Sequence, residues 1–272
     1  MNIFTILLVQ PLANGLILFY KIFGANLGIA ILLFSVFLIF ALRPLTKPYM
    51  ASMKKMKDLE PQLSKLKKKF AGDKLKMSQA QADLYKQYKI NPMGGCLPYL
   101  LQFAVLIALF NVFTTVLSSD GAVTTKINTL LYPALKLSED HALNTHFLYL
   151  DISKPDTIQI PGIPFAVPGL FLILATIAQF LSVKITAPYI SAEKKVAAKT
   201  KSETDDVQVA MQQSMIYTLP LMTLFFGLKF PSGLALYWLV FSVVNVWQQV
   251  GISGWGGLTP WVNIVKSRLG KK

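Results

Sequence analysis

Long stretches of apolar residues dominate the pattern of this chain. Four of them contain no charged residue over 21, 30, 27 and 22 positions, and they lie between Lys21 and Arg43, Lys89 and Asp120, Asp156 and Lys184, and Asp206 and Lys229. A fifth apolar run begins at Leu234 and continues to Ile252. A helix needs about 20 apolar residues to cross the hydrocarbon layer of a membrane, and segments that are apolar on every face differ from the alternating strands of a membrane barrel. The pattern predicts an all-α polytopic membrane protein with five transmembrane helices, over residues 23–45, 97–117, 167–185, 213–228 and 231–252.

The segments between the predicted spans are more polar. Residues 46–92 are expected to form a cytoplasmic helical hairpin, because apolar residues recur at the helical period from Met56 to Phe70 with lysines on the opposite face. Pro61 should bend or restart the first helix of this hairpin. We expect an outer loop over 118–166, a cytoplasmic loop over 186–212 and a basic cytoplasmic tail over 253–272. Residues 159–168 (QIPGIPFAVP) are expected to run as an extended entry into the third span.

The first 22 residues form a separate apolar segment that polar residues interrupt. On a helix, Gln10, Asn14 and Lys21 fall on one narrow face, which favours a helix lying in the outer membrane interface. A sixth span or an uncleaved signal anchor is the alternative. The segment has no positively charged beginning, so no cleaved signal peptide is expected.

The basic residues predict the orientation in the membrane. Of 27 Lys and Arg residues, 22 lie in segments 43–92, 184–212 and 251–272. Of the 13 acidic residues, eight lie in these same segments and five in the rest of the chain. Cytoplasmic loops of membrane proteins are enriched in Lys and Arg, so the N-terminus is expected outside and the C-terminus in the cytoplasm. The cytoplasmic excess predicts anionic lipids and ribosomal RNA as partners. Four hairpin lysines are the candidate recruitment residues, Lys54, Lys57, Lys65 and Lys68; alternatively, these lysines only set the topology and the hairpin only packs on itself.

Several chemistries are not expected from this sequence. The predicted spans contain no ionisable residue between their ends, whereas ion pumps and proton-coupled transporters usually need buried ionisable relays. The one cysteine, Cys96, and the two histidines, His141 and His146, have no partners at metal-ligand spacing, so neither a metal nor another cofactor is expected. Nucleotide-binding and zinc-protease motifs are absent, so we expect a protein that is not an enzyme.

Uncharged polar residues are concentrated in the cytoplasmic half of the predicted spans. The candidates are Gln102, Gln179, Ser182, Thr218, Ser242, Asn245 and Gln249, and in the fifth span Trp238, Ser242, Asn245 and Gln249 share one helix face. Unpaired polar groups cost several kcal/mol in lipid, so these side chains must meet water or one another. This arrangement predicts a hydrophilic groove open to the cytoplasm and closed toward the outside. Hydrogen bonds that only hold the spans together are the alternative.

Four motifs, in this order, carry a resemblance to a known family. They are VQPLANGLILFYKIFG, RPLTKPYMASMKKMKDLEPQLSKLKKKF, INPMGGCLPYLLQ and FPSGLALYWLVFSVVNVWQQ. Over residues 8–251 the chain resembles the YidC/Oxa/Alb family of membrane protein insertases, in the shorter form without a large extra periplasmic domain. The resemblance implies a bacterial plasma (inner) membrane protein that inserts nascent membrane proteins, alone or with the Sec translocon, and that works beside the ribosome.

The resemblance also implies roles for individual residues. The family's aromatic pair in the fifth span, which contacts substrate helices, corresponds to Tyr237 and Trp238. The family's groove arginine would stand at Ile39, whereas the first span of this chain has its arginine at Arg43. The two positions are one helical turn apart, about 6 Å along the axis. Arg43 therefore either serves the same groove or anchors the helix at the interface.

These features together predict how the protein works. A nascent polar tail enters the groove, and the apolar segment that follows leaves between the third and fifth spans into lipid. Two alternatives remain: a membrane chaperone that assembles spans inserted by another translocon, and a small-solute transporter.

Overall fold

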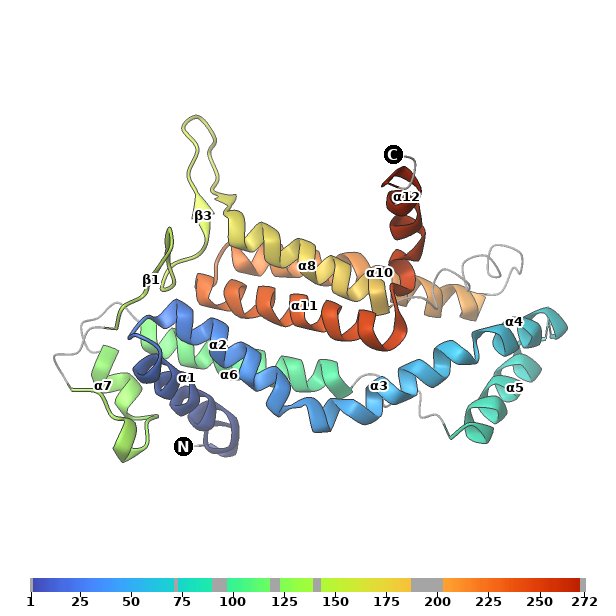
Figure 1. Ribbon diagram of the computed structural model, residues 1–272, viewed down its shortest axis with the longest axis horizontal. Coiled ribbons are helices and arrows are strands. Elements are labelled where there is room, and N and C mark those ends of the chain that lie inside the picture. Colours follow the sequence, from blue (N-terminus) through green and yellow to red (C-terminus); the bar gives the residue numbers. More distant parts are fainter. Residues whose placement is uncertain are drawn as a thin grey trace. The chain divides into compact units, whose positions relative to one another are not determined.

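The computed structural model describes residues 2–70, 73–89, 97–117, 123–138, 143–186 and 203–269, and it is mostly helical (Figure 1). The chain divides into two compact units. Unit 1 contains Met1–Leu42, Tyr99–Ala178 and Leu221–Val244, and unit 2 contains Arg43–Pro98, Gln179–Pro220 and Asn245–Lys272. Long helices such as α11 (Ser232–Ser253) continue from one unit into the other.

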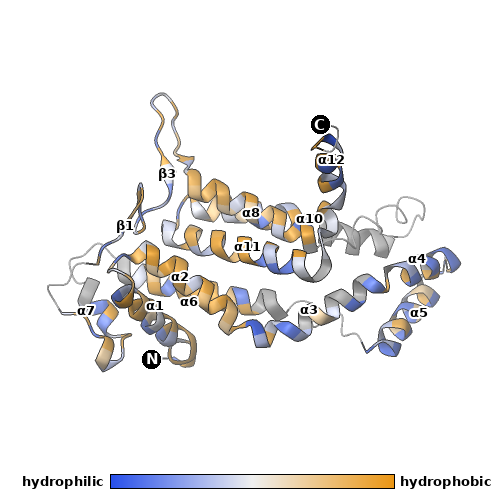
Figure 2. Ribbon diagram, viewed as in Figure 1, coloured by the Kyte–Doolittle hydropathy of each residue, from blue (hydrophilic) through white to orange (hydrophobic). Residues whose placement is uncertain are grey.

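Unit 1 contains most of the apolar helices. They are η1 (Thr5–Val9), α1 (Gln10–Ile22), α2 (Leu27–Ala41), most of α6 (Leu97–Leu117) and α8 (Leu170–Thr186), and parts of α10 (Glu203–Gly227) and α11. Figure 2 shows hydrophobic residues along these helices. Among the described residues, Thr5–Ile22 and Ser232–Gly251 are long and apolar enough to cross a membrane, and four shorter apolar stretches are Leu27–Ala41, Leu101–Thr115, Leu170–Ile185 and Ile216–Gly227. The apolar helices thus occur where the sequence predicts spans, and the N-terminal segment passes the same test.

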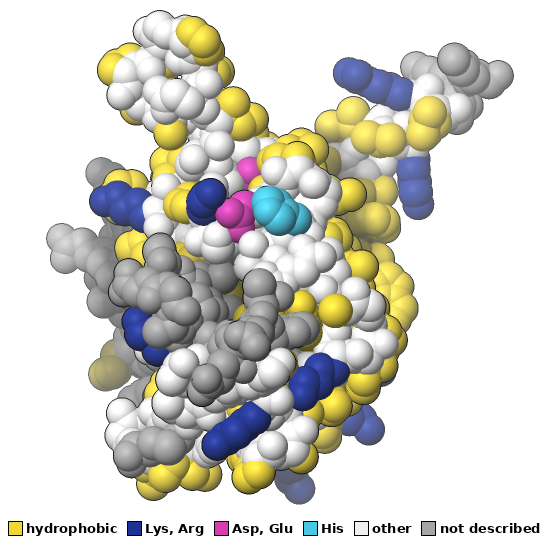
Figure 3. Space-filling view, turned by 90° about the vertical axis from the view of Figure 1, so that its left-hand side faces the viewer, with side chains coloured by type: hydrophobic (Ala, Val, Ile, Leu, Met, Phe, Trp, Pro, Cys, Tyr) yellow, Lys and Arg dark blue, Asp and Glu magenta, His cyan; other side chains and the backbone are white. Residues whose placement is uncertain are grey.

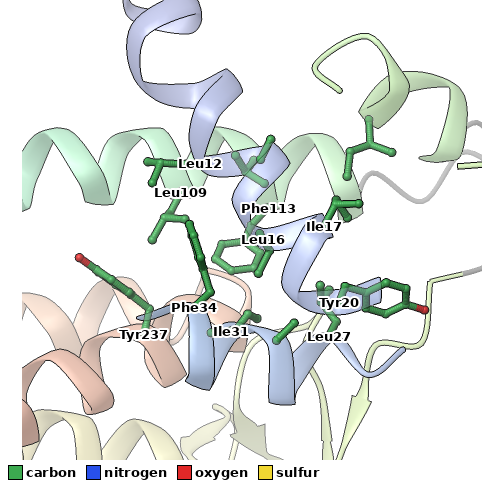
Figure 4. Close-up of a cluster of buried hydrophobic side chains, with 14 of the residues drawn as sticks. Leu12, Leu16, Ile17, Tyr20, Leu27, Ile31, Phe34, Leu109, Phe113 and Tyr237 are labelled. Atoms are coloured by element: carbon green, nitrogen blue, oxygen red, sulfur yellow. The ribbon is translucent and has the colours of Figure 1, made fainter. Parts of the chain in front are cut away.

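The core of unit 1 lies where α1, α2, α6 and α11 meet. Figure 4 shows Leu16, Phe34, Leu109 and Phe113 gathered between these helices, and all four are buried. Gly15 permits the close approach of α1 to α2, because a Cβ at this position would collide with the Phe34 ring. Small residues at helix contacts favour close van der Waals packing, which stabilises helix association in membranes.

The polar face of the N-terminal helix does not lie open. The Asn14 amide is buried, donates to the carbonyls of Gln10 and Leu130, and accepts from the Tyr132 backbone N–H at 2.7 Å. Lys21 donates to the Lys136 carbonyl at 3.2 Å. This face therefore binds the segment around α7 (Val123–Asn128) and η3 (Pro133–Leu135), a contact that the periodicity of the helix alone does not reveal.

The described part of the predicted outer loop contains two small β-hairpins. Strands β1 (His146–Phe147) and β2 (Leu150–Asp151) form the first, and β3 (Thr157–Ile158) and β4 (Val167–Pro168) form the second. The expectation that 159–168 runs extended into the third span is therefore wrong. The chain turns back on itself because the Ile163 N–H bonds the Ile160 carbonyl and the strands on either side pair. His141 lies outside the described residues, and His146 is exposed in β1.

Unit 2 contains the polar helices α3 (Arg43–Asp58), α4 (Glu60–Lys69) and α5 (Lys74–Gln87), and also η4 (Gly256–Leu258) and α12 (Thr259–Leu269). α4 begins at Glu60 with Pro61 in its first turn, so the predicted restart at this proline is confirmed. α4 and α5 pack through the buried side chains of Leu59, Leu63 and Tyr85. At the open end of the pair, the Gln62 amide donates to the Tyr88 hydroxyl at 3.1 Å. The hairpin therefore has an apolar seam and an outer surface with exposed lysines.

Candidate functional site

The first part of the candidate site is a hydrogen bond between α6 and α11 in unit 1. The Tyr237 hydroxyl donates to Oε1 of Gln102 at 3.0 Å, and Tyr237 is only 2% exposed. Figure 4 shows the Tyr237 ring beside the core cluster with its hydroxyl directed away from it. The apolar residues around the ring fix its position, so the phenol holds the Gln102 side chain at a defined place on α6.

The other end of the Gln102 amide has no hydrogen-bond partner among the described residues. Among the described residues, two buried side-chain atoms have no hydrogen-bond partner, Nε2 of Gln102 and Nε2 of Gln248. A buried donor without a partner costs about 1–3 kcal/mol. Two unsatisfied amides on helices of a membrane protein therefore indicate places where water or another polar group is needed.

The second part of the candidate site lies in unit 2, between α8 and the C-terminal part of α11. Nδ2 of Asn245 donates to Oγ of Ser182 at 3.0 Å, and Ser182 is buried. Gln249 is buried one turn further along α11 and also has an interaction partner. The helix face predicted for the fifth span therefore carries buried polar groups in both units: Ser242 is buried in unit 1, and Trp238 is half-buried.

The remaining candidate residues are not part of these two pairs. Gln179 is half-buried on α8 and has an interaction partner, whereas Thr218 is exposed on α10. Arg43 is exposed and is the first residue of α3, since α2 ends at Ala41. The single continuous helix that would put Arg43 one turn after Ile39 is therefore interrupted at Leu42, whose backbone caps α2.

The hairpin lysines are only partly described. Lys65 and Lys68 are exposed on α4, as expected for residues that meet a charged partner. The side chains of Lys54 and Lys57 lie outside the described part of the chain.

Other polar residues in the apolar helices satisfy their hydrogen bonds locally. Asn111 and Thr114 of α6 donate to the carbonyls of Ile107 and Phe110, and the buried Ser35 of α2 donates to the Ile31 carbonyl. The outer half of the predicted spans is therefore not free of polar side chains. What distinguishes the two candidate pairs is that each joins two different helices, and sequence position alone does not reveal this difference.

Sequence reasoning also missed a contact at the C-terminal end of α8. The Lys184 ammonium lies 3.2 Å from the centre of the Trp261 ring of α12 and 5.3 Å from that of Phe180. Gly256 permits this contact, because it has a positive φ and a Cβ here would collide with the Ile185 carbonyl. Sequence signals for it were the three glycines in residues 254–257 and the two tryptophans of the basic tail, Trp255 and Trp261.

The described residues contain no group of three or more His, Cys, Asp or Glu side chains that could hold a metal ion. The polar groups of the site are amides and hydroxyls, which bind water and peptide groups. Such groups can therefore bind water or the peptide groups of a polar chain segment.

Comparison with known proteins identifies the family. The profile of the family described as 60Kd inner membrane protein matches residues 18–255. Three similar proteins, each named membrane protein insertase YidC, come from Pelobacter propionicus, Syntrophobacter fumaroxidans and Shewanella sp. (strain MR-7). They are 32%, 33% and 36% identical to this chain over 90%, 90% and 87% of it, and the match covers 38%, 37% and 35% of their own lengths. The chain thus spans well under half of these relatives, and over the part that matches it belongs to the 60Kd inner membrane protein family.

Proposed function

We propose that this protein is a membrane protein insertase of the bacterial inner membrane. The observation that carries the proposal is the Gln102–Tyr237 pair, in which Oε1 of an amide on an apolar helix accepts a hydrogen bond while the buried Nε2 has no partner among the described residues. The names of the similar proteins point to the same activity. Nascent membrane proteins are the proposed substrates, and the ribosome, the Sec translocon and membrane lipids are the proposed partners.

The proposed topology has five spans, an outer N-terminus and a cytoplasmic C-terminus. The distribution of Lys and Arg supports it, because the basic segments alternate with those assigned to the outside. In this orientation Gln102, Ser182 and Asn245 belong to the cytoplasmic half of the spans. The residues proposed to meet water are Gln102 and Ser242 in unit 1, and Gln179, Ser182, Thr218, Asn245 and Gln249 in unit 2.

The proposed mechanism lowers the cost of moving a polar tail into the membrane. A free amide donor such as Nε2 of Gln102 offers hydrogen bonds to water or to a peptide carbonyl, which replaces part of the solvation that the tail loses. The apolar segment behind the tail then leaves between α8 and α11 into lipid, because burial of its apolar surface is favourable. No covalent step and no nucleotide are needed.

The test is insertion into liposomes that contain only the purified full chain. A short single-span substrate should become protected from added protease well above the level in protein-free liposomes. Protection no higher than in protein-free liposomes rejects the insertase proposal. Binding of substrate helices without insertion would instead support the membrane chaperone, and solute flux would support the transporter.

A matched pair of variants tests the groove itself. The double variant Gln102→Leu with Asn245→Leu should lower insertion by at least about tenfold, which corresponds to the loss of about 1.4 kcal/mol of stabilisation. The control is Asn111→Leu, which removes an amide of the same chemistry that bonds within its own helix. Equal insertion by the double variant and the control, at equal protein levels, would mean that the two residues only hold helices together.

A further inference from the structure

The second outer hairpin, residues 157–168, has a defined conformation. Thr157 pairs with Pro168 and Ile158 with Val167, and the Gln159 amide donates to the Ile163 carbonyl at 3.2 Å. Gly162 has a φ of +89°, which the turn requires and which other residues adopt at a cost. The backbone of the tip is thus held by its own hydrogen bonds, and the side chains are free to contact something else.

The surface of this hairpin is apolar and carries no charge. Phe165 is 66% exposed, Ile158 49% and Ile160 41%, and no charged residue occurs between Asp156 and Lys184. Figure 3 shows the projection at the upper left covered by hydrophobic and other uncharged atoms, with no Lys, Arg, Asp or Glu side chain on it. Exposed apolar clusters on a folded protein usually mark a surface that another partner covers.

The hairpin is fixed to the outer end of α8. Asp156 is 2% exposed; its carboxylate accepts from the Leu172 N–H at 2.8 Å and from the Tyr149 hydroxyl at 2.9 Å, and its carbonyl accepts from the Gly169 N–H at 2.8 Å. A Cβ at Gly169 would collide with this carboxylate. From this junction the hairpin projects sideways, across the direction of α8 (Figure 1).

The apolar surface continues from the hairpin onto α8. Leu170, Ile173, Leu174 and Ile177 of α8 are exposed and apolar, and they belong to unit 1 together with the hairpin. If α8 spans the membrane, this exposed face meets lipid, and a structure that leaves its outer end sideways runs along the membrane surface. The partner of the hairpin is then the same bilayer that surrounds α8.

We propose that the hairpin of residues 157–168 inserts into the outer interface of the membrane, with Ile158, Ile160 and Phe165 at the boundary between headgroups and acyl chains. The proposal rests on the assignment of α8 as a span in the proposed function. Burial of apolar side chains drives the contact, and phenylalanine is among the residues that interfacial segments bury at this depth. Because the segment is uncharged, its insertion does not depend on anionic lipids.

The experiment places an environment-sensitive fluorophore at single cysteines of the full chain, in which Cys96→Ser removes the native thiol. The test site is Phe165→Cys, the control for outer water is Lys154→Cys, and the control for lipid contact in the span is Ile177→Cys. Each labelled protein is reconstituted in liposomes with lipids that carry a quenching nitroxide either near the headgroup or deep in the acyl chains. We expect headgroup-level quenching at 165 to exceed deep quenching, deep quenching to dominate at 177, and little quenching at 154.

The outcomes separate the hairpin from the span. Quenching at 177 with none at 165 overturns the hairpin proposal and leaves the span intact, and it would point to a protein partner or a second copy. Absence of quenching at both sites removes the span assignment as well. Quenching at 165 should be equal in neutral and in anionic liposomes and insensitive to salt; a requirement for anionic lipid would contradict the apolar mode of binding.

Discussion

The hydroxyl of Tyr237 on α11 donates to Oε1 of Gln102 on α6, 3.0 Å away. In the sequence Tyr237 belongs to an aromatic pair and Gln102 is a polar residue in an apolar helix; in the structure they form one hydrogen-bonded unit. The apolar core orients the phenol, and the phenol orients the amide. The donor end of Gln102 is thereby left without a partner among the described residues.

Removal of this hydroxyl should uncouple the two helices. Tyr237→Phe leaves the Gln102 amide without its partner and should destabilise the protein by about 1–3 kcal/mol. In the background of Gln102→Leu the same change should cost much less, because no buried acceptor is then left unpaired. Unfolding in detergent of both single variants and the double variant measures the coupling, and additive effects would contradict the pairing.

A second cycle addresses Ser182 and Asn245 in unit 2. Ser182→Ala removes the acceptor of the Asn245 amide and should cost about 1 kcal/mol of stability. If the bond only holds α8 to α11, insertion should follow stability alone. If the pair also serves the groove, Asn245→Leu should lower insertion in the liposome assay more than Ser182→Ala at matched stability. Thr176→Ala is the control, since its hydroxyl bonds the Leu172 carbonyl within α8.

The local sequence pattern predicted the positions of the helices well, but it did not predict the segments between them or the segments that pack against them. The helix predicted at 97–117 runs from Leu97 to Leu117, because a charge-free apolar run identifies such a helix without knowledge of its partners. The hairpin at 157–168 escaped prediction because strands of two residues carry no measurable periodicity. The local pattern also did not predict which face of each helix turns toward which partner. Asn14, for example, bonds Leu130 and Tyr132, which lie 116 and 118 positions away in the sequence, and no local spacing encodes such contacts.

Variants of Arg43 test whether the positive charge of this side chain attracts the polar tails of substrates. The side chain is exposed at the start of α3, where it meets either water or lipid headgroups. If it attracts substrate tails, Arg43→Ala should reduce insertion of substrates with acidic tails several-fold more than that of substrates with neutral tails, and Arg43→Lys should retain most of the difference. Equal losses for both substrates would identify Arg43 as an interface anchor. The measurement is protease protection of paired substrates at low and high salt, since attraction between exposed charges is screened.

The hairpin formed by β1 and β2 should lose stability at low pH. Burial alone would raise the pKa of Asp151, but hydrogen bonds from Ser153 and Thr145 and the Lys154 ammonium at 3.2 Å outweigh burial and hold the pKa at about 2, below the ordinary 3.8. A lowered pKa in the folded state stabilises the fold at pH values above the ordinary pKa, and this contribution is lost as the pH falls through the folded value. The protection factors of the amides over 145–154, which correct for the intrinsic pH dependence of hydrogen exchange, should therefore be constant above about pH 5 and fall toward pH 2. Asp151→Asn should make the protection weaker and independent of pH in this range.

The attachment of the β3–β4 hairpin to α8 depends on Asp156. Removal of the Asp156 carboxylate should therefore lower the stability of the folded protein and not only that of a surface loop. Asp156→Ala deprives the Leu172 N–H and the Tyr149 hydroxyl of their acceptor in a buried place, which should cost about 2–4 kcal/mol. The matched control is Asp73→Ala, which removes an exposed side chain that accepts from the Lys76 N–H at the start of α5, and a smaller loss is expected there. Unfolding in detergent measures both variants.

With the fluorophore at residue 165, Asp156→Ala should also weaken headgroup-level quenching, because a hairpin that is no longer fixed to α8 is not held along the membrane surface. Unchanged quenching in a destabilised variant would mean that Asp156 stabilises α8 and that the hairpin finds the interface without it.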